Sequence, residues 1–379
     1  MLTSAIPAQA HDSPAVPLPV AGADPTLAAP PLEPDIPVSR VTAWQDDAAL
    51  LLRERANLGP VFRRGERVIL LDAAHNHLVL ADDGARFVPL AREADLPVDL
   101  PVDLAVLERA LGAELGRWRA GTVRFQSAMA MTLARALVPA VTGLAYGSGP
   151  AERLANALGT LDDGRSLLRR AMPRGLPSSP MGARKALAQG LHQAGCTAPG
   201  LLDAVQASHA TALRVLGTLV RHLADTPDWQ DTLRAEVRSA YRPAAGTGAA
   251  PETLELVDMA TNEALRLMPG PLLVERRVAA DVMVGEHRLE AGTLVAISPA
   301  LTHADPALWP EPQRFDPLRF AAPRAAARAP GAWIAQETLP GGAGPAVLAA
   351  ARLGIAHLLD RFVLAPAGEG GKVLLRHAD

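Results

Sequence analysis

The distribution of helical and strand periodicity along the chain constrains its fold most strongly. Most segments between residues 104 and 267 repeat apolar residues at helical spacing, and the longest of them runs from about 199 to 223. Alternation of apolar and polar residues, which is typical of strands, is confined to residues 61–71 and 282–298. Because a βαβ array needs strands between its helices, this distribution predicts a mainly helical α+β fold with small antiparallel sheets in the N- and C-terminal parts.

Composition separates residues 1–38 from the rest of the chain. They are rich in proline and alanine and contain few large apolar side chains. Such a segment cannot bury enough surface to offset the entropy that is lost on ordering, so we expect a flexible leader. Periodicity begins at Val41, and we expect residues 39–379 to form a single domain.

Charge and cysteine content exclude several classes of function. The formal net charge of −3 gives no electrostatic reason to expect nucleic acid as a partner. No stretch long enough to span a bilayer is free of charge, proline or glycine, and no basic segment followed by an apolar one begins the chain, so we expect a cytoplasmic protein without membrane insertion. The single cysteine, Cys196, excludes an intramolecular disulfide and any multi-cysteine metal site.

A specific motif pattern starts in the helix that we expect over residues 251–267. Glu263 and Arg266 lie three residues apart there, so they share one helical face and can pair. After the alternating segment 282–298 come His303-Ala304-Asp305-Pro306 and Pro312-Gln313-Arg314-Phe315. Together these motifs, E-x-x-R, a small sheet, H-x-D-P and P-x-R-F, resemble the C-terminal half of cytochrome P450.

The resemblance implies a buried ion triad of Glu263, Arg266 and Arg314, with glutamine replacing the family's glutamate at position 313. A carboxylate between two guanidinium groups is well satisfied, and removal of one partner would leave an uncompensated buried charge. The implied role of the triad is therefore structural.

The loop that holds haem in this family departs from its pattern here. The family sequence is approximately F-G-x-G-x-R-x-C-x-G, and residues 339–353 read LPGGAGPAVLAAARL. Gly342 and Gly344 match the pattern, and Leu348 occupies the position of the thiolate ligand. Three further family residues, a phenylalanine, an arginine and a glycine, are replaced by Gly341, Ala346 and Ala350. A leucine side chain has no lone pair to donate to iron, whereas thiolate donation is what drives P450 chemistry.

The oxygen-activating helix and the haem propionate contacts are also altered. The family's A-G-x-(D/E)-T aligns with residues 204–208, where Val205 replaces the glycine, Ala207 replaces the acid and Ser208 keeps a hydroxyl. Arg276 or Arg277 occupies the stretch in which the family places an arginine against a propionate. A solvated pair of charges at the start of a strand is an equally good interpretation of these two residues.

Two further segments differ from the family. The motif W/H-x-x-x-R of the family's C helix is not met, because Trp118 is followed four residues later by Thr122. The stretch between Phe125 and Leu201 is shorter than the family usually carries, which predicts a shortened lid region.

Two functions from different classes remain open. P450-like proteins without the haem cysteine are known as auxiliary partners of glycosyltransferases in antibiotic pathways, and this resemblance implies a non-catalytic, haem-free partner protein in secondary metabolism. The alternative is an atypical haem-binding P450 oxidoreductase, a monooxygenase or peroxygenase, with a non-cysteine ligand. His209 and His357 lie on expected helices and are the candidates for that ligand, although a lone helical histidine is usually structural.

Overall fold

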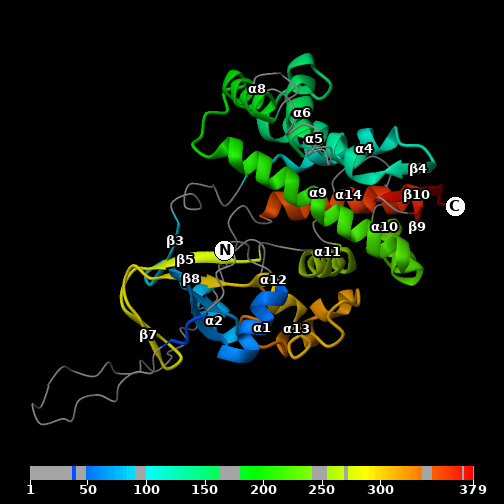
Figure 1. Cartoon of the computed structure of the whole chain (residues 1–379). Coiled ribbons are helices and arrows are strands. Elements are labelled where there is room, and N and C mark those ends of the chain that lie inside the picture. Colours follow the sequence, from blue (N-terminus) through cyan, green and yellow to red (C-terminus); the bar gives the residue numbers. More distant parts are fainter. Residues whose placement is uncertain are drawn as a thin grey trace, which may run out of the picture.

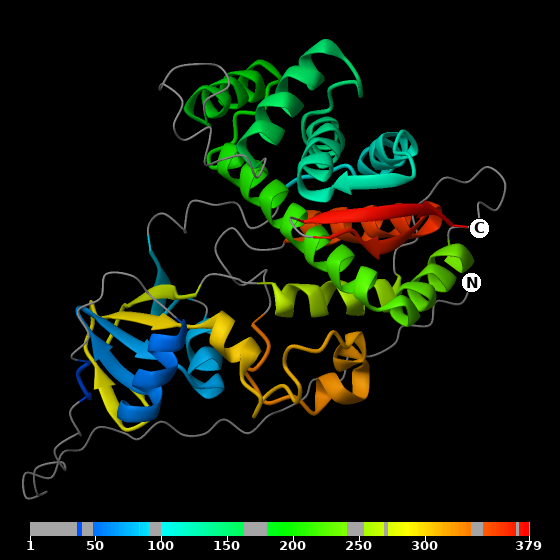
Figure 2. The same cartoon turned by 45° about the vertical axis from the view of Figure 1, so that its right-hand side comes forward.

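The computed structural model describes residues 36–39, 48–82, 84–90, 100–162, 180–240, 254–268, 272–334, 344–368 and 371–378. It confirms the mainly helical fold with small sheets. Figures 1 and 2 show a region of packed helices and a region that carries the largest sheet, with α11 (Glu255–Leu267) between them. The ion cluster predicted around Glu263 therefore lies where the two regions meet.

The helical region is built around the 25-residue helix α9 (Leu201–Asp225) and the last helix, α14 (Pro345–Arg361). These helices approach closely, since a Cβ atom on Gly354 of α14 would lie 3.0 Å from Leu216 Cδ1 of α9. The largest apolar core contains residues of both helices and of α11. The remaining helices of this region are α4 (Leu104–Gly116), α5 (Phe125–Thr142), α6 (Gly149–Asp162), α8 (Pro180–Gln193) and α10 (Pro227–Ala240).

The largest sheet has five strands in the order β1-β2-β8-β5-β3. The pairing of β2 with β8 is parallel, in the register Ile69↔Ala296, so strands from both parts of the chain share one sheet. Residue alternation indicates a strand but not its partner, and for this reason the sequence predicts two separate antiparallel sheets. The strands are β1 (Val61–Arg64), β2 (Arg67–Leu70), β3 (Phe87–Pro89), β5 (Val274–Val278) and β8 (Leu294–Ile297).

Two smaller antiparallel sheets complete the strand content. One is the hairpin of β6 (Val282–Val284) and β7 (His287–Leu289), which matches the alternation in the sequence. The other has the order β4-β10-β9 and joins β4 (Gly121–Arg124), β10 (Lys372–His377) and β9 (Phe362–Pro366). This second sheet is not predicted from the sequence, because β4 has four residues and lies between two strongly helical segments.

The structure also contains shorter helices, which are α1 (Ala48–Leu58), α2 (Ala73–Leu80), α12 (Pro299–Ala304), the 3₁₀ helix η1 (Pro317–Phe320) and α13 (Ala322–Ala326). The last residues of the predicted leader pair with the sheet: Val38 forms a parallel bridge to Arg63, and the Arg63 amide donates to the Pro37 carbonyl at 2.7 Å. Residues 1–35 lie outside the described part. Among the helices of the described residues, none is long and apolar enough to cross a membrane.

Candidate functional site

The centre of the candidate site is a bidentate ion pair on α11. Arg266 donates from Nε to Glu263 Oε2 and from Nη2 to Glu263 Oε1, both at 2.8 Å. Both side chains are almost fully buried, at 1% and 0% exposure. Two parallel charge-assisted hydrogen bonds compensate the desolvation of both charges, so the pairing predicted for Glu263 and Arg266 is present in the structure.

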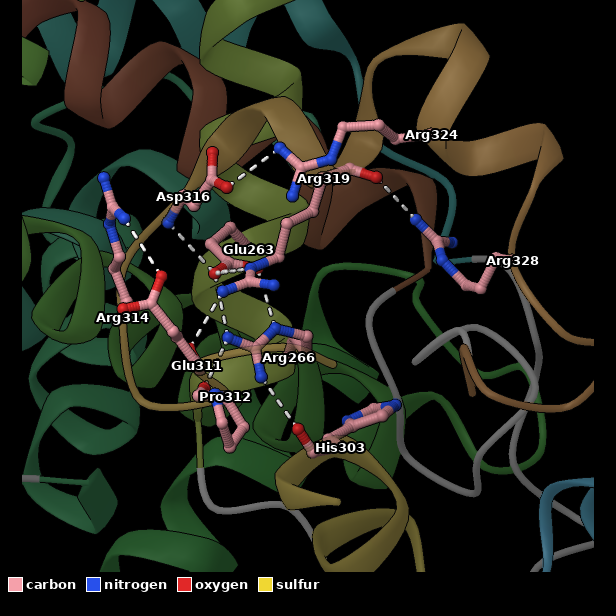
Figure 3. Close-up of polar contacts among 10 residues, drawn as sticks. All are labelled: Glu263, Arg266, His303, Glu311, Pro312, Arg314, Asp316, Arg319, Arg324 and Arg328. Carbon is pink, nitrogen blue, oxygen red and sulfur yellow. Dashed lines mark hydrogen bonds and ion pairs between the residues drawn. The ribbon is translucent and has the colours of Figure 1, made fainter. Parts of the chain in front are cut away.

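The prediction that Arg314 completes the cluster is wrong. Arg314 pairs with Glu311 at 3.1 Å, and both side chains are about 70% exposed, at 68% and 71%. The third member is Arg319 of η1, whose Nε lies 3.3 Å from Glu263 Oε1 and whose side chain is 5% exposed. Figure 3 shows Arg319 directed towards Glu263 and Arg314 directed towards Glu311.

The sequence contains a signal that could have identified Arg319. The pattern P-x-R-F occurs twice within nine residues, at 312–315 and at 317–320. The first copy lies in the irregular stretch before η1, and the second forms η1 itself. Only the second copy places its arginine beside α11, and two equivalent copies cannot be separated by pattern alone.

Glu263 and Arg266 also connect α11 to the segment that follows α12. Arg266 donates to the carbonyls of His303 and Pro312, each at 2.7 Å, and the Asp316 amide donates to Glu263 Oε1 at 3.1 Å. Figure 3 shows these contacts converging on the pair from three sides. The cluster therefore fixes the irregular segment 303–319 against α11.

Alanine substitutions of Arg319 and Arg314 are expected to have different effects on stability. Arg319→Ala removes a buried ion-pair partner of Glu263 and should lower the free energy of unfolding by about 2 kcal/mol, less than the loss of a whole buried pair, because Glu263 stays paired with Arg266. Arg314→Ala removes an exposed pair and should change it by less than about 0.5 kcal/mol. Urea denaturation of both variants measures the difference. Equal losses in the free energy of unfolding would contradict the assignment of Arg319, rather than Arg314, to the cluster.

His303 and a group of aromatic residues cover the other side of the cluster. The His303 ring stacks on Trp333 at 5.0 Å between centroids, and its Nε2 accepts the Ile334 amide at 3.1 Å. Arg328 lies over the rings of Trp309 and Phe320, at 4.8 and 4.7 Å. Burial, together with the positive charges of Arg266 and Arg328, lowers the pKa of His303 to about 3.

This lowered pKa predicts a stability that depends on pH. Between the ordinary value of 6.5 and about 3, the unfolded chain binds the proton and the folded protein does not, so stability falls as pH falls through this window. One such group contributes a slope of at most about 1.4 kcal/mol per pH unit. Burial lowers the pKa of His75, His222 and His357 as well, and their contributions have the same sign.

His303→Gln isolates the contribution of this residue, because a carboxamide can still accept the Ile334 amide but does not titrate. Chemical denaturation at pH 7 and pH 5 should show a smaller loss on acidification in the variant than in the wild type. His192→Phe, on an exposed position of α8, should retain the wild-type loss. An unchanged loss in His303→Gln would contradict the prediction.

Leu348, the residue predicted at the position of the haem thiolate, lies in the first turn of α14. Gly344 is the N-cap of this helix, and Gly342 lies outside the described residues. Leu348 is partly buried and packs against the largest core, while Ala346 is buried in a second core that also contains Val205 of α9. Residues 345–353 read PAVLAAARL and offer no side-chain sulfur, carboxylate or imidazole. These residues do not fit a haem held by a thiolate.

Both candidate histidines pack against other helices of the core. His209 is fully buried on α9, and its Nε2 contacts the Ala130 carbonyl of α5 at 2.8 Å. His357 lies three turns along α14 and packs against Gly112 of α4, where an added Cβ would lie 3.1 Å from its Cε1. Both rings are thus held in contacts with helices of the core.

The other predicted site residues lie apart. On β5, Arg276 is buried on the same face as Val274 and Val278, and Arg277 is exposed on the opposite face and donates to the Gly292 carbonyl at 3.0 Å. The two arginines therefore cannot act as one pair. Cys196 lies in the connection between α8 and α9, partly buried beside the second core.

Similarity to known proteins centres on the same part of the chain. A family profile described as Cytochrome P450 matches residues 200–345. Thromboxane-A synthase of Mus musculus is 35% identical over 151 residues, which are 39% of this chain and 27% of that protein. Cytochrome P450 3A29 of Sus scrofa is 36% identical over 115 residues, which are 30% of this chain and 23% of that protein. The matches thus span about a quarter of these relatives.

The similarity in structure is more extensive than the similarity in sequence. Retinoic acid-bound cyanobacterial CYP120A1 superposes with a TM-score of 0.62 and 16% identity, over 88% of this chain and 95% of that one. The chain thus has a cytochrome P450-like fold. The profile match includes Glu263, Arg266 and Arg319 and ends at Pro345, before Leu348.

Proposed function

We propose that this chain derives from the cytochrome P450 family but has lost haem-thiolate monooxygenase chemistry, and that it acts as a non-catalytic partner protein. The observation that carries the proposal is Leu348, the residue that the resemblance puts at the thiolate position, which lies in the first turn of α14 and packs against the main core. An aliphatic side chain at this point cannot donate to iron, so the reaction that depends on thiolate donation has no ligand.

The contrast between the ion cluster and the haem loop supports the proposal. Glu263 is paired with Arg266 and Arg319, and these buried contacts fix the segment 303–319 against α11. The positions that would serve haem carry Ala346 and Leu348, and Val205 is buried where the family has a glycine beside dioxygen. A protein that preserves the fold but carries aliphatic side chains at the predicted haem positions is suited to binding a partner through its surface.

The partner that we propose is a cytoplasmic glycosyltransferase of secondary metabolism. This part of the proposal rests on analogy with P450-like auxiliary proteins that also lack the haem cysteine, and fold analogy alone does not identify a function. In this role the protein would bind the sugar-transferring enzyme and raise its activity without any redox step.

The test requires a candidate glycosyltransferase, which is sought first among the genes that neighbour the gene for this chain. Its specific activity is measured alone, with the purified protein, and with protein that has been expressed with added hemin. The proposal predicts a complex on size-exclusion chromatography and the same activation in both preparations. Unchanged transferase activity and separate elution would contradict the auxiliary role.

The alternative function is that of an atypical haem-binding P450 with a non-cysteine ligand. Arg276 favours it, because this arginine is 6% exposed and occupies the stretch of the family's propionate contact. In that case His209→Phe or His357→Phe should abolish haem binding. Retention of haem by both variants would exclude the two histidines as ligands.

A further inference from the structure

A groove at the end of the helical region has no role in the proposed function. It lies between the C-terminal half of α9, the first residues of α5 and the hairpin β9–β10, and its volume is about 470 Å³. Small-molecule sites commonly have volumes of roughly 300–1,000 Å³. Among the described residues that line it, none belongs to α14, so this groove is separate from the position of Leu348.

The rim of the groove is basic. Arg214 and Arg221 line it from one face of α9, and Lys372 lines it from β10, whereas Asp225 is the one carboxylate among the described lining residues. Among the described residues, Arg221 and Lys372 form no ion pair, and both are exposed. The groove therefore presents a net positive charge that the described part of the chain leaves largely uncompensated.

The strand register adds a further cation beside the groove. Lys372 of β10 lies directly opposite Arg124 of β4, at the point where β4 ends and α5 begins. Like charges at directly opposed positions destabilise an antiparallel pair. An anion bound between these side chains would relieve that repulsion, and the positive end of α5 adds to the attraction.

The floor of the groove is apolar. The nearly buried Phe125, Met268 and Val373 line it, together with Pro366 and Ala367, which are exposed and half-buried. A ligand that fills the groove would therefore place an apolar body on these side chains and a charged group towards the arginines and the lysine. Guanidinium groups bind carboxylate and phosphate well because their donors match the geometry of both anions.

We propose that this groove binds a small organic anion, an aromatic or aliphatic body that carries one phosphate or carboxylate group. The groove between α9, α5 and β10 has the volume of a small-molecule site, and its described lining combines three cations with apolar residues. Haem plays no part in this site, so its occupation does not depend on the function proposed for the rest of the molecule.

Isothermal titration calorimetry with 1-naphthyl phosphate and with 1-naphthoate tests the site, and the two probes identify the preferred anionic group. At least one should bind saturably with one molecule per chain, and neutral 1-naphthol should bind at least about tenfold more weakly. The double variant Arg221→Gln, Lys372→Gln should weaken binding of the same probe about tenfold, because two charge-assisted contacts are lost.

Arg53→Gln is the matched control, since it removes one exposed arginine on α1, which does not line the groove. It should bind the probe as the wild type does. Because the substituted side chains are exposed, thermal melts should show that all variants are folded. Absence of saturable binding by both probes, or equal affinity in the wild type and the double variant, would overturn the proposal.

Discussion

Glu263→Gln is expected to lower the free energy of unfolding by about 3–5 kcal/mol, the range measured when one partner of a buried ion pair is removed. The substitution leaves Arg266 at 1% side-chain exposure without its carboxylate, and it removes the partner of Arg319. It also replaces an acceptor that receives the Asp316 amide. Urea denaturation followed by circular dichroism measures the loss.

Glu311→Gln is the control for this variant. It removes the same charge from the same region of the chain, but the pair of Glu311 with Arg314 is exposed. Its effect should remain below about 0.5 kcal/mol. Since native proteins have only about 5–15 kcal/mol of stability, Glu263→Gln is also expected to lower the yield of folded protein. A variant as stable as Glu311→Gln would contradict the structural role of the cluster.

Gly331→Ala is expected to destabilise the fold by roughly 3 kcal/mol or more, because two costs add. Gly331 has a backbone φ of +75°, a value that residues other than glycine rarely adopt. A Cβ atom at this position would also lie 1.9 Å from the Ala73 carbonyl oxygen and 2.8 Å from the His77 nitrogen of α2. The backbone segment would have to move away from α2, where Asn76 now bonds to Thr302 at 2.8 Å.

Gly65→Ala separates the two costs. Gly65 has a φ of +61° in the turn between β1 and β2, and no atom lies within 4 Å of the position of its Cβ. It should therefore show only the conformational cost, about 1 kcal/mol. Thermal unfolding of both variants gives the comparison, and similar losses would mean that the approach of residue 331 to α2 is not tight.

Local signals in the sequence located the long helices α9, α10 and α11, but they did not predict α8 and were insufficient for the sheets. Pro227 marks the first residue of α10, and apolar spacing marks α9 to within about two residues of its observed ends. The parallel pairing of β2 with β8 joins segments more than 200 residues apart, and alternation carries no information about the partner. The same limit explains why β4 was missed: it is recognisable as a strand only through its pairing with β10.

The candidate site shows the same distinction. The spacing of Glu263 and Arg266 determines that they share a helical face, so their contact follows from helix geometry. The third member comes from a different element, and its identity depends on how the segment 303–319 folds back on α11. The sequence offers Arg314 and Arg319 in equivalent motifs, and only the packing of η1 selects Arg319.

The measurement that bears most directly on the proposed loss of haem-thiolate chemistry is the haem content of the full chain expressed with added hemin, followed by its CO difference spectrum after reduction. Because we propose that Leu348 replaces the thiolate ligand, we predict far less than one haem per chain and no red-shifted CO peak. A Soret band without that peak would favour the alternative of a non-cysteine ligand. One haem per chain together with the red-shifted peak would contradict the proposal, because it requires a thiolate on the iron.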